Sequence, residues 1–336
     1  MNSFPLLITL VQFAVSGGEC FYKMPIFVLK ITEFSKKIFP MQPIPKNSLK
    51  AWILASRPKT LAAGSVPVLV ASGLAAHFNS FNLVPAILCL SFALLAQIAS
   101  NFSNDYYDFI KKTDNEDRLG PARAVASGWI EPKRMLYVTL LTIVVACFLG
   151  LGLVLYGGWE MIVVGAVCVV SLMAYTAGPW PLAYHGLGDL FVLVFFGFVA
   201  VVFSFYVQTQ MFDYLAFVSG AVVGLGAVNI MVINNYRDRD TDKLSHKNTT
   251  IVKFGEAFGR WFYFLNGVFA CLLCLVFLRE SMVWAAVLPL IYLIPHYLTW
   301  RKMVRIKQGR ALNSILGETA RNLLILGELL TIGMLI

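Results

Sequence analysis

Charged residues are scarce in this chain of 336 residues, since Asp, Glu, Lys and Arg together make up 13% of it. Soluble domains carry about 25% of such residues, so the composition excludes an ordinary soluble domain. Hydrophobic residues make up 58%, and several apolar runs approach the ~20 residues that a helix needs to cross a bilayer. The sequence therefore predicts an all-α integral membrane protein.

The cysteines lack the partners of a metal or redox site. Cys271 and Cys274 have the CxxC spacing, but they lie within an apolar run, with no histidine or further cysteine nearby. The other four also lie mostly inside apolar runs: Cys20, Cys89, Cys147 and Cys168. We interpret all of them as packing residues.

The first 50 residues lack the regular pattern of the rest of the chain. Their apolar piece, residues 5–15, has no basic residue before it, so it lacks the basic leading region of a secretory signal peptide. Residues 20–50 carry lysines among aromatic residues, which fits either an interfacial amphipathic segment or a disordered extension without a role in the chemistry. We treat residues 1–50 as an N-terminal extension and residues 51–336 as the functional domain.

From Trp52 onward the apolar stretches follow one another in regular order. Nine of them are long enough to cross a membrane as helices. The predicted stretches are 60–78, 83–103, 134–156, 159–177, 188–208, 213–233, 261–279, 282–299 and 316–335. Proline and glycine inside some of them are tolerated within a helical bundle. The expected fold is therefore a bundle of nine transmembrane helices.

Lysine and arginine are almost absent from one set of connecting loops. Of the 27 such residues, all except Arg279 and Arg321 lie before the first stretch or in the loops after the second, sixth and eighth stretches. Because basic residues accumulate on the cytoplasmic side of a membrane, this asymmetry predicts a cytoplasmic N-terminus. It also accounts for the net charge of +9 without a nucleic-acid partner.

The first dense charge cluster near membrane depth lies at residues 101–123. Asn104 and Asp108 are four residues apart, and Asp105 and Asp108 are three apart, so a helix places their oxygens on one face. Asp114 continues the acidic character, and lysines and arginines stand among the acids. Carboxylates interleaved with cations suit Mg²⁺ and a phosphorylated ligand, although a solvated cytoplasmic loop has a similar composition.

A second cluster follows the sixth stretch. Asn234, Asp238 and Asp242 are spaced four residues apart and so share one helical face. Lys247 follows five residues later. Ionisable residues at the edge of a membrane bundle indicate function, and two clusters matched in type and side argue against a solvated loop. We predict that the two faces hold Mg²⁺ between them and clamp a diphosphate against basic side chains.

These residues resemble the UbiA superfamily of membrane prenyltransferases, and the resemblance covers residues 50–336. It rests on ASRPKTL at 55–61, NDYYD at 104–108, DRLGPAR at 117–123, YTAGPWPLAYHGLGDLFVLVFFG at 175–197, and NNYRDRDTD with KNT at 234–249. The stretches DRLGPAR and GLGDLFVLVFFG favour the branch of the superfamily that acts on 1,4-dihydroxy-2-naphthoate.

The resemblance implies a nine-helix bundle around a central cavity that opens laterally to lipid. It also implies a set of Mg²⁺ and diphosphate residues: Asn104, Asp105, Asp108, Asp238, Asp242 and Lys247. One position departs from the commoner pattern, because Lys112 stands where an acid is expected. The naphthoate branch shifts this acid, which makes Asp114 the candidate ligand here.

The implied activity is Mg²⁺-dependent transfer of a polyprenyl group from polyprenyl diphosphate to 1,4-dihydroxy-2-naphthoate, with loss of CO₂. The product is demethylmenaquinol, an intermediate of menaquinone biosynthesis in the bacterial inner membrane. Transfer of a prenyl or phytyl group to 4-hydroxybenzoate or homogentisate is an alternative that the DRLGPAR stretch disfavours. An ion or solute transporter is disfavoured because its acids would lie near the bilayer midplane.

Several further side chains are candidates for the same reaction. Arg118 and Arg123, together with Lys247, are expected to take up the charge of the diphosphate. A carbocation-like prenyl group is stabilised by aromatic faces. Tyrosines near the right depth are Tyr106, Tyr107, Tyr175 and Tyr236.

Arg57 and Asp189 each have two interpretations. Arg57 either anchors the chain on the cytoplasmic side or pairs with the carboxylate of the aromatic acceptor. Asp189 lies in a loop without Lys or Arg, where an acid either binds a substrate hydroxyl or caps the following helix.

Overall fold

All regular structure is helical in the residues that the computed structural model describes, which are 44–111, 118–178 and 181–336. Residues Lys46–Ile336 form a single unit. Most of the predicted extension 1–50 lies outside the described residues, so the division at residue 50 stays a prediction.

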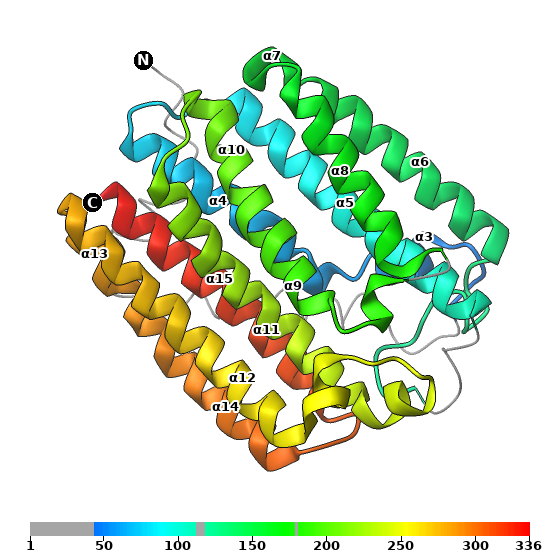
Figure 1. Cartoon of the computed structure of the whole chain (residues 1–336). Helices are drawn as coiled ribbons and strands as arrows, with labels where there is room; N and C mark the ends of the chain where they lie inside the picture. The colour runs from blue at the N-terminus through cyan, green and yellow to red at the C-terminus, as the bar shows by residue number, and fades with distance from the viewer. Residues whose placement is uncertain (1–43, 112–117, 179–180) are drawn as a thin grey trace. The chain divides into compact units, whose positions relative to one another are not determined.

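The helices follow one another with short connections (Figure 1). In chain order they are α3 (Leu49–Ala55), η1 (Pro58–Thr60), α4 (Ala62–His77), α5 (Leu83–Ile110), α6 (Pro132–Leu151), α7 (Val154–Gly157), α8 (Glu160–Thr176), η2 (Leu182–Tyr184), α9 (Gly188–Val192), η3 (Leu193–Val199), α10 (Ala200–Thr209), α11 (Tyr214–Leu244), α12 (Thr250–Cys274), η4 (Leu275–Glu280), α13 (Val283–Val287), η5 (Leu288–Tyr292), α14 (Leu293–Ile306) and α15 (Leu312–Leu335). The η3 segment is a π-helix, and the other η segments are 3₁₀-helices.

Within the described residues, six helical segments are long and apolar enough to cross a membrane, so the chain is a multi-pass membrane protein. They are Leu83–Ile110, Pro132–Gly157, Gly188–Thr209, Tyr214–Leu244, Thr250–Glu280 and Val283–Ile306. The α3–α4 pair is bent by 51°, α8 is short, and α15 carries Glu318, Arg321 and Glu328. The count of nine spans and the cytoplasmic N-terminus therefore stay predictions.

Two helices extend well past the ends of the predicted stretches. The second stretch was predicted to end at residue 103 and the sixth at residue 233, but α5 continues to Ile110 and α11 to Leu244. Neither extension contains glycine or proline, so nothing in the local sequence stops the helix where the apolar character ends. Asn104, Asp105 and Asp108 are therefore on α5, and Asn234, Asp238 and Asp242 are on α11, so these side chains are held by helices rather than by loops.

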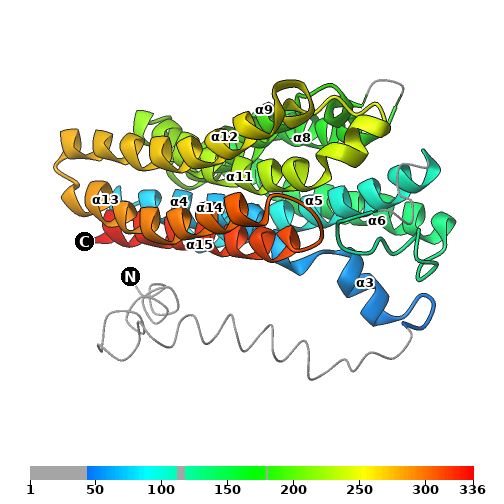
Figure 2. The same ribbon diagram turned by 90° about the horizontal axis from the view of Figure 1, so that it is seen from below.

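The long helix α11 lies at the centre of the bundle and packs against α12, α15 and η3. Figures 1 and 2 show α12, α14 and α15 on one side of it, while α5, α6 and α8 form a separate group of neighbours. The contact with η3 is backbone to backbone, because Gly220 and Gly224 of α11 meet Gly197. Small residues allow such close approach of membrane helices, and this contact fixes α11 against the π-helix.

Substituting Gly197 by alanine is expected to destabilise the protein by about 1–3 kcal/mol. An added Cβ would lie 2.5 Å from the carbonyl oxygen of Gly220 and 2.9 Å from the Cα of Gly224, so the two backbones would have to move apart. Thermal unfolding in detergent measures the change. Gly317→Ala is the matched control, because its Cβ would meet no atom within 4 Å. Equal melting temperatures for the two variants would contradict the close contact.

Candidate active site

A cavity of about 570 Å³ joins the two polar clusters. Asn104 and Asp108 line it from α5, and Asn234, Asp238 and Asp242 line it from α11. Four predicted basic residues line the same cavity: Arg57, Arg118, Arg123 and Lys247. The remaining wall is mainly apolar. The cavity thus has a charged end, formed by the ends of α5 and α11, and an apolar continuation.

On the α5 side, Asp108 is held by two side chains from later segments. Its Oδ2 accepts a hydrogen bond of 2.8 Å from Nη2 of Arg123, and its Oδ1 accepts one of 3.4 Å from the hydroxyl of Tyr184. Arg123 is almost fully buried, with 7% of its side chain exposed. A charge-assisted bond in such surroundings is strong and fixes the carboxylate toward the cavity.

On the α11 side, Arg237 clamps the neighbouring Asp238. Its Nε donates to one carboxylate oxygen at 2.8 Å and its Nη2 to the other at 2.6 Å. The Nη1 atom of the same guanidinium donates to Oδ1 of Asn313 at 2.9 Å. One turn later, Nζ of Lys247 lies 3.6 Å from Oδ1 of Asp242. Both acids of the second cluster therefore have cations beside them.

Two bridges connect the clusters, although they are about 130 residues apart in the chain. Asn313 bonds to Arg237 and also donates to the carbonyl of Leu119 at 2.9 Å, which ties α11 to the loop that carries Arg118. The ring of Tyr184 faces Lys247 at 5.8 Å, beside the Asp108 that its hydroxyl contacts. The arrangement brings acids and cations of both clusters to one place.

The charged side chains at this end of the cavity also act on one another through their electric fields. Asp108 and Asp238 are both close enough to Asp242 for their charges to act on it. Lys111 lies 5.1 Å from the centre of the Tyr184 ring and donates to a backbone carbonyl at 2.6 Å. Burial lowers the pKa of Lys111, and the nearby Asp108 carboxylate opposes this shift. The charges of three carboxylates therefore act on the same end of the cavity, which favours a cation there.

Asp105 is placed differently from its neighbours. It was predicted as a metal ligand, but it does not belong to the lining of the cavity, and 1% of its surface is exposed. Its two carboxylate oxygens accept the backbone N–H groups of Ala124 and Val125 at 2.9 and 3.0 Å. The helical spacing put Asp105 beside the correct face but not on it. Its role in the structure is to hold the loop that carries Arg123.

Asp189 is likewise outside the lining of the cavity. Its Oδ2 accepts a 2.5 Å hydrogen bond from the hydroxyl of Thr250 at the start of α12, and it does not cap its own helix. The helix cap that the sequence suggested is therefore not formed, and the substrate contact stays a prediction, since the Oδ1 atom of Asp189 is buried without a hydrogen-bond partner among the described residues. The acid instead connects α9 to α12.

The tyrosines that were predicted to stabilise a prenyl cation lie in different places. Tyr175 lines the cavity, whereas Tyr106, Tyr107 and Tyr236 are not among its lining residues. Tyr236 is fully buried, and its hydroxyl donates to Glu256. Asp114 lies outside the described residues, so its predicted role as a ligand stays a prediction.

Sequence reasoning missed two residues of the charged end, Arg237 and Tyr184. Arg237 was counted only as a cytoplasmic positive charge, although it is three residues from Asn234 and therefore near the same helical face. That spacing could have identified it. Tyr184 follows the eighth helix in a short 3₁₀ turn, and no spacing in the sequence relates it to Asp108.

The residues of the charged end fit a hard divalent cation such as Mg²⁺. The Oδ1 atom of Asn104 and the Oδ2 atom of Asp242 are buried oxygens without a hydrogen-bond donor, and oxygens of this kind are preferred Mg²⁺ ligands. Across residues 44–111, 118–178 and 181–336, no three His, Cys, Asp or Glu side chains form a metal site by themselves. Mg²⁺ usually takes only one or two carboxylates and completes its shell with substrate phosphates and water.

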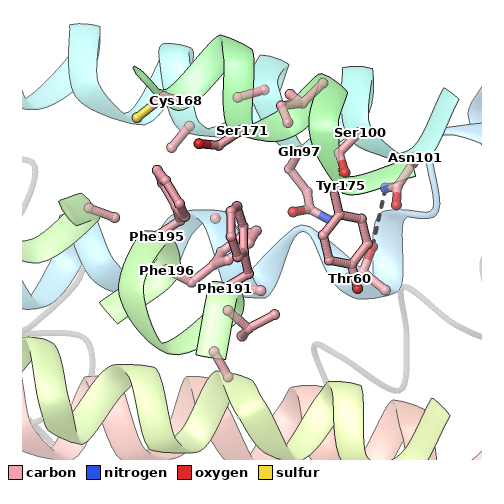
Figure 3. A pocket seen from close by; sticks show the side chains of 18 of the residues that line it. Thr60, Gln97, Ser100, Asn101, Cys168, Ser171, Tyr175, Phe191, Phe195 and Phe196 are labelled. Atoms are coloured by element: carbon pink, nitrogen blue, oxygen red, sulfur yellow. Dashed lines mark hydrogen bonds between the residues drawn. The ribbon is translucent and has the colours of Figure 1, made fainter. Parts of the chain in front are cut away.

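The apolar part of the cavity runs between α8 and the α9–η3 segment. Figure 3 shows Cys168, Ser171 and Tyr175 on one wall, with Phe191 and Phe195 facing the space from the other. Such a chamber suits a hydrocarbon chain attached to the group that the charged end holds. Together the two parts form one amphiphilic cavity, suited to a diphosphate that is attached to an apolar chain.

The UbiA prenyltransferase family model matches residues 65–316, and the chain belongs to this family. Among curated relatives, 1,4-dihydroxy-2-naphthoate octaprenyltransferase of Escherichia coli K12 is 35% identical over 231 residues, covering 66% of this chain and 75% of that protein. The Mycobacterium leprae protein of the same name is 37% identical over 216 residues, covering 64% and 73%. UbiA prenyltransferase domain-containing protein 1 of Danio rerio is 29% identical over 289 residues, covering 81% and 83%.

Solved structures share the fold at lower identity. A UbiA homolog from Aeropyrum pernix K1 is similar with a TM-score of 0.60 and 14% identity, covering 81% of this chain and 96% of that chain. A UbiA homolog from Archaeoglobus fulgidus, bound to DMAPP and Mg²⁺, has a TM-score of 0.58 and 15% identity, covering 84% and 99%.

Proposed function

We propose that this prenyltransferase moves a polyprenyl group from polyprenyl diphosphate to 1,4-dihydroxy-2-naphthoate, with loss of CO₂, and forms demethylmenaquinol for menaquinone biosynthesis. The observation that carries the proposal is a single cavity in which an acidic and basic end continues into an apolar chamber. The names of the relatives from Escherichia coli and Mycobacterium leprae support the naphthoate as acceptor.

The charged end would hold Mg²⁺ through five side chains: Asn104, Asp108, Asn234, Asp238 and Asp242. When bound, Mg²⁺ neutralises the diphosphate and makes it a better leaving group. The Mg²⁺-bound homolog from Archaeoglobus fulgidus supports a divalent metal in this fold. Around these oxygens, Arg118, Arg123 and Lys247 line the cavity and take up the negative charge of the phosphates.

The rest of the cavity governs the transfer itself. The bond between prenyl C1 and the diphosphate oxygen breaks, and its electron pair leaves with the diphosphate. The ring carbon that bears the carboxylate forms the new bond to C1, and the bond from this carbon to the carboxylate then breaks, so that CO₂ leaves and its electron pair returns to the ring. Tyr175 offers an aromatic face for the positive charge on the prenyl group. Arg57 pairs with the acceptor's carboxylate before it is lost.

The proposal also includes the location of the reaction. The distribution of lysine and arginine supports a cytoplasmic N-terminus and a charged end on the cytoplasmic side, and we propose that the membrane is the bacterial inner membrane. Both substrates then meet at one membrane surface: the diphosphate head reaches the charged end from the cytoplasmic side, and the isoprenoid chain stays in apolar surroundings.

The assay that tests the function uses the purified full chain in detergent, with Mg²⁺ and labelled polyprenyl diphosphates. A panel of acceptors includes the dihydroxynaphthoate, 4-hydroxybenzoate and homogentisate. We expect the prenylated naphthol with release of labelled CO₂ from a carboxyl-labelled acceptor. Chelation with EDTA is expected to lower the rate at least about a thousandfold, because the diphosphate charge is then uncompensated, and added Mg²⁺ should restore it.

Two results would contradict this function. Product from another acceptor but none from the naphthoate would reject the proposed acceptor and keep the prenyl transfer. A full rate in EDTA would reject the metal-assisted departure of the diphosphate. Recovery of the rate by Mg²⁺ serves as the control that EDTA has not unfolded the protein.

A further inference from the structure

One polar atom in the apolar part of the cavity has no hydrogen-bond partner among the residues that the structure describes. The Oε1 atom of Gln97 is buried and accepts no hydrogen bond, and the residue lines the cavity from α5. A buried amide oxygen without a donor costs about 1–3 kcal/mol, so such a group is expected to meet a donor on a ligand. Figure 3 shows Gln97 and Tyr175 pointing into the same space.

The position of Gln97 on α5 relates it to the charged end. It precedes Asn104 by seven residues, or two helical turns, which is about 10.5 Å along the axis. A bicyclic aromatic ring fits within this length with one edge near the diphosphate and the other near Gln97. The side-chain amide of Gln97 therefore lies at the depth of the far edge of an acceptor ring whose near edge is beside the diphosphate.

Hydrogen bonds of Asn101 connect the part of α5 that carries Gln97 to the turn that carries Arg57. Asn101, one turn after Gln97, donates through Nδ2 to the carbonyl of Ser56 at 2.9 Å and to Oγ1 of Thr60 at 3.4 Å (Figure 3). These bonds tie the turn that carries Arg57 to the face of α5 that carries Gln97. The turn is unusual, because Arg57 itself has a positive φ of 52°, a conformation that costs energy and persists only where neighbours fix it.

The two substrates differ in what they can offer to Gln97. An isoprenoid chain has no hydrogen-bond donor, and the diphosphate belongs at the charged end. A phenolic hydroxyl is a donor and an acceptor, and it is carried on a flat ring that matches the aromatic wall of Tyr175 and Phe191. Of the groups that the two substrates carry, an aromatic hydroxyl is the donor that satisfies the buried amide oxygen.

We infer that Gln97 binds a ring hydroxyl of the aromatic acceptor, and that Arg57 and Gln97 together fix the orientation of its ring. This inference rests on the proposed function, because it assigns a contact within the same reaction. A hydrogen bond to the hydroxyl oxygen also positions the ring carbon that is to be prenylated against prenyl C1. Gln97 is thereby a determinant of acceptor specificity.

The test compares Gln97→Leu with the unchanged protein in the prenylation assay. Leucine keeps most of the volume and removes the amide, so the KM for the dihydroxynaphthoate is expected to rise about tenfold, while the KM for polyprenyl diphosphate stays the same. Gln308→Leu is the matched control, because it makes the same change at an exposed residue that does not line the cavity. Its acceptor KM should not change.

Acceptor analogues separate a hydrogen bond from a loss of shape. The inhibition constants of 1-hydroxy-2-naphthoate and 4-hydroxy-2-naphthoate are measured for both proteins. The analogue that lacks the hydroxyl bound by Gln97 should bind the Leu variant and the unchanged protein equally, and the other should bind the variant about tenfold more weakly.

Two outcomes would overturn the inference. The first is an unchanged acceptor KM in Gln97→Leu. The second is an equal weakening of the binding of both analogues, because this would indicate an altered cavity shape rather than a lost hydrogen bond. If the unchanged protein prenylates a different phenolic acid instead of the naphthoate, the proposed function fails. Gln97→Leu and the unchanged protein are then compared with that acid and with its analogue that lacks the hydroxyl. The inference about Gln97 then stands or falls separately.

Discussion

Asp238→Asn is expected to lower the kcat of prenyl transfer at least about a thousandfold, equivalent to roughly 4 kcal/mol of transition-state stabilisation. Asparagine keeps the size of the side chain and one acceptor for Arg237, but it removes the negative charge. The buried guanidinium, 2% exposed, then has a neutral partner. A cation at the charged end would lose one of three neighbouring carboxylates, and the diphosphate would leave less readily.

The control for this substitution lies two residues further along α11. Asp240 is exposed and does not line the cavity, so Asp240→Asn removes the same charge from another face of the helix. Both variants are purified from membranes and compared in kcat and in thermal unfolding. We expect a nearly unchanged rate for Asp240→Asn and similar yields of both proteins. A rate within tenfold of normal for Asp238→Asn would remove Asp238 from the catalytic machinery.

The same expectation applies to Asp108→Asn on the α5 wall of the cavity. The carboxylate of Asp108 contacts Arg123 and is close enough to Asp242 for their charges to interact. We therefore expect a loss of the same order. Similar losses from α5 and α11 would indicate that both helices act on the same diphosphate rather than on separate sites.

The helical face of each cluster could be predicted because it depends on local geometry. Residues three or four apart share a face of any α-helix, so the spacing of Asn104 and Asp108, and of Asp238 and Asp242, was sufficient to predict that each pair would point to the same side, and all four line the cavity. The helix ends were predicted less well. Hydropathy marks where the membrane-like composition stops, but α5 and α11 continue until Lys111 and Ser245 cap them.

Contacts between distant segments could not be predicted from one sequence. Asn313 bonds to a carbonyl 194 residues earlier, at Leu119, and no local pattern relates these two positions. The same holds for Tyr184, whose hydroxyl reaches Asp108 across 76 residues. Such contacts depend on how the helices pack, and they decide which of several candidate acids faces the cavity.

Asp105 is the clearest example of this limit, and Asp105→Ala is expected to destabilise the protein by about 2–4 kcal/mol. Its carboxylate accepts the backbone N–H groups of Ala124 and Val125 in a buried position, so alanine leaves two donors without partners. The loop that carries Arg123 would then shift relative to Asp108. A displacement of about 1 Å is enough to reduce the rate roughly a hundredfold.

The neighbouring Asn104 provides the comparison that separates positioning from metal binding. Its Oδ1 has no donor among the described residues, so Asn104→Ala should lower the rate and raise the Mg²⁺ concentration needed for half-maximal rate, with little change in thermal unfolding. Asp105→Ala should show the opposite pattern, with an early unfolding transition and an unchanged Mg²⁺ requirement for its remaining activity. If Asp105→Ala instead raised the Mg²⁺ requirement at normal stability, Asp105 would be a metal ligand, as its spacing in the sequence first suggested. With the expected results, Asn104 binds the metal and Asp105 holds the loop, although they are adjacent on α5. Their roles differ because a rotation of about 100° about the helix axis separates a side chain in the cavity from one behind it.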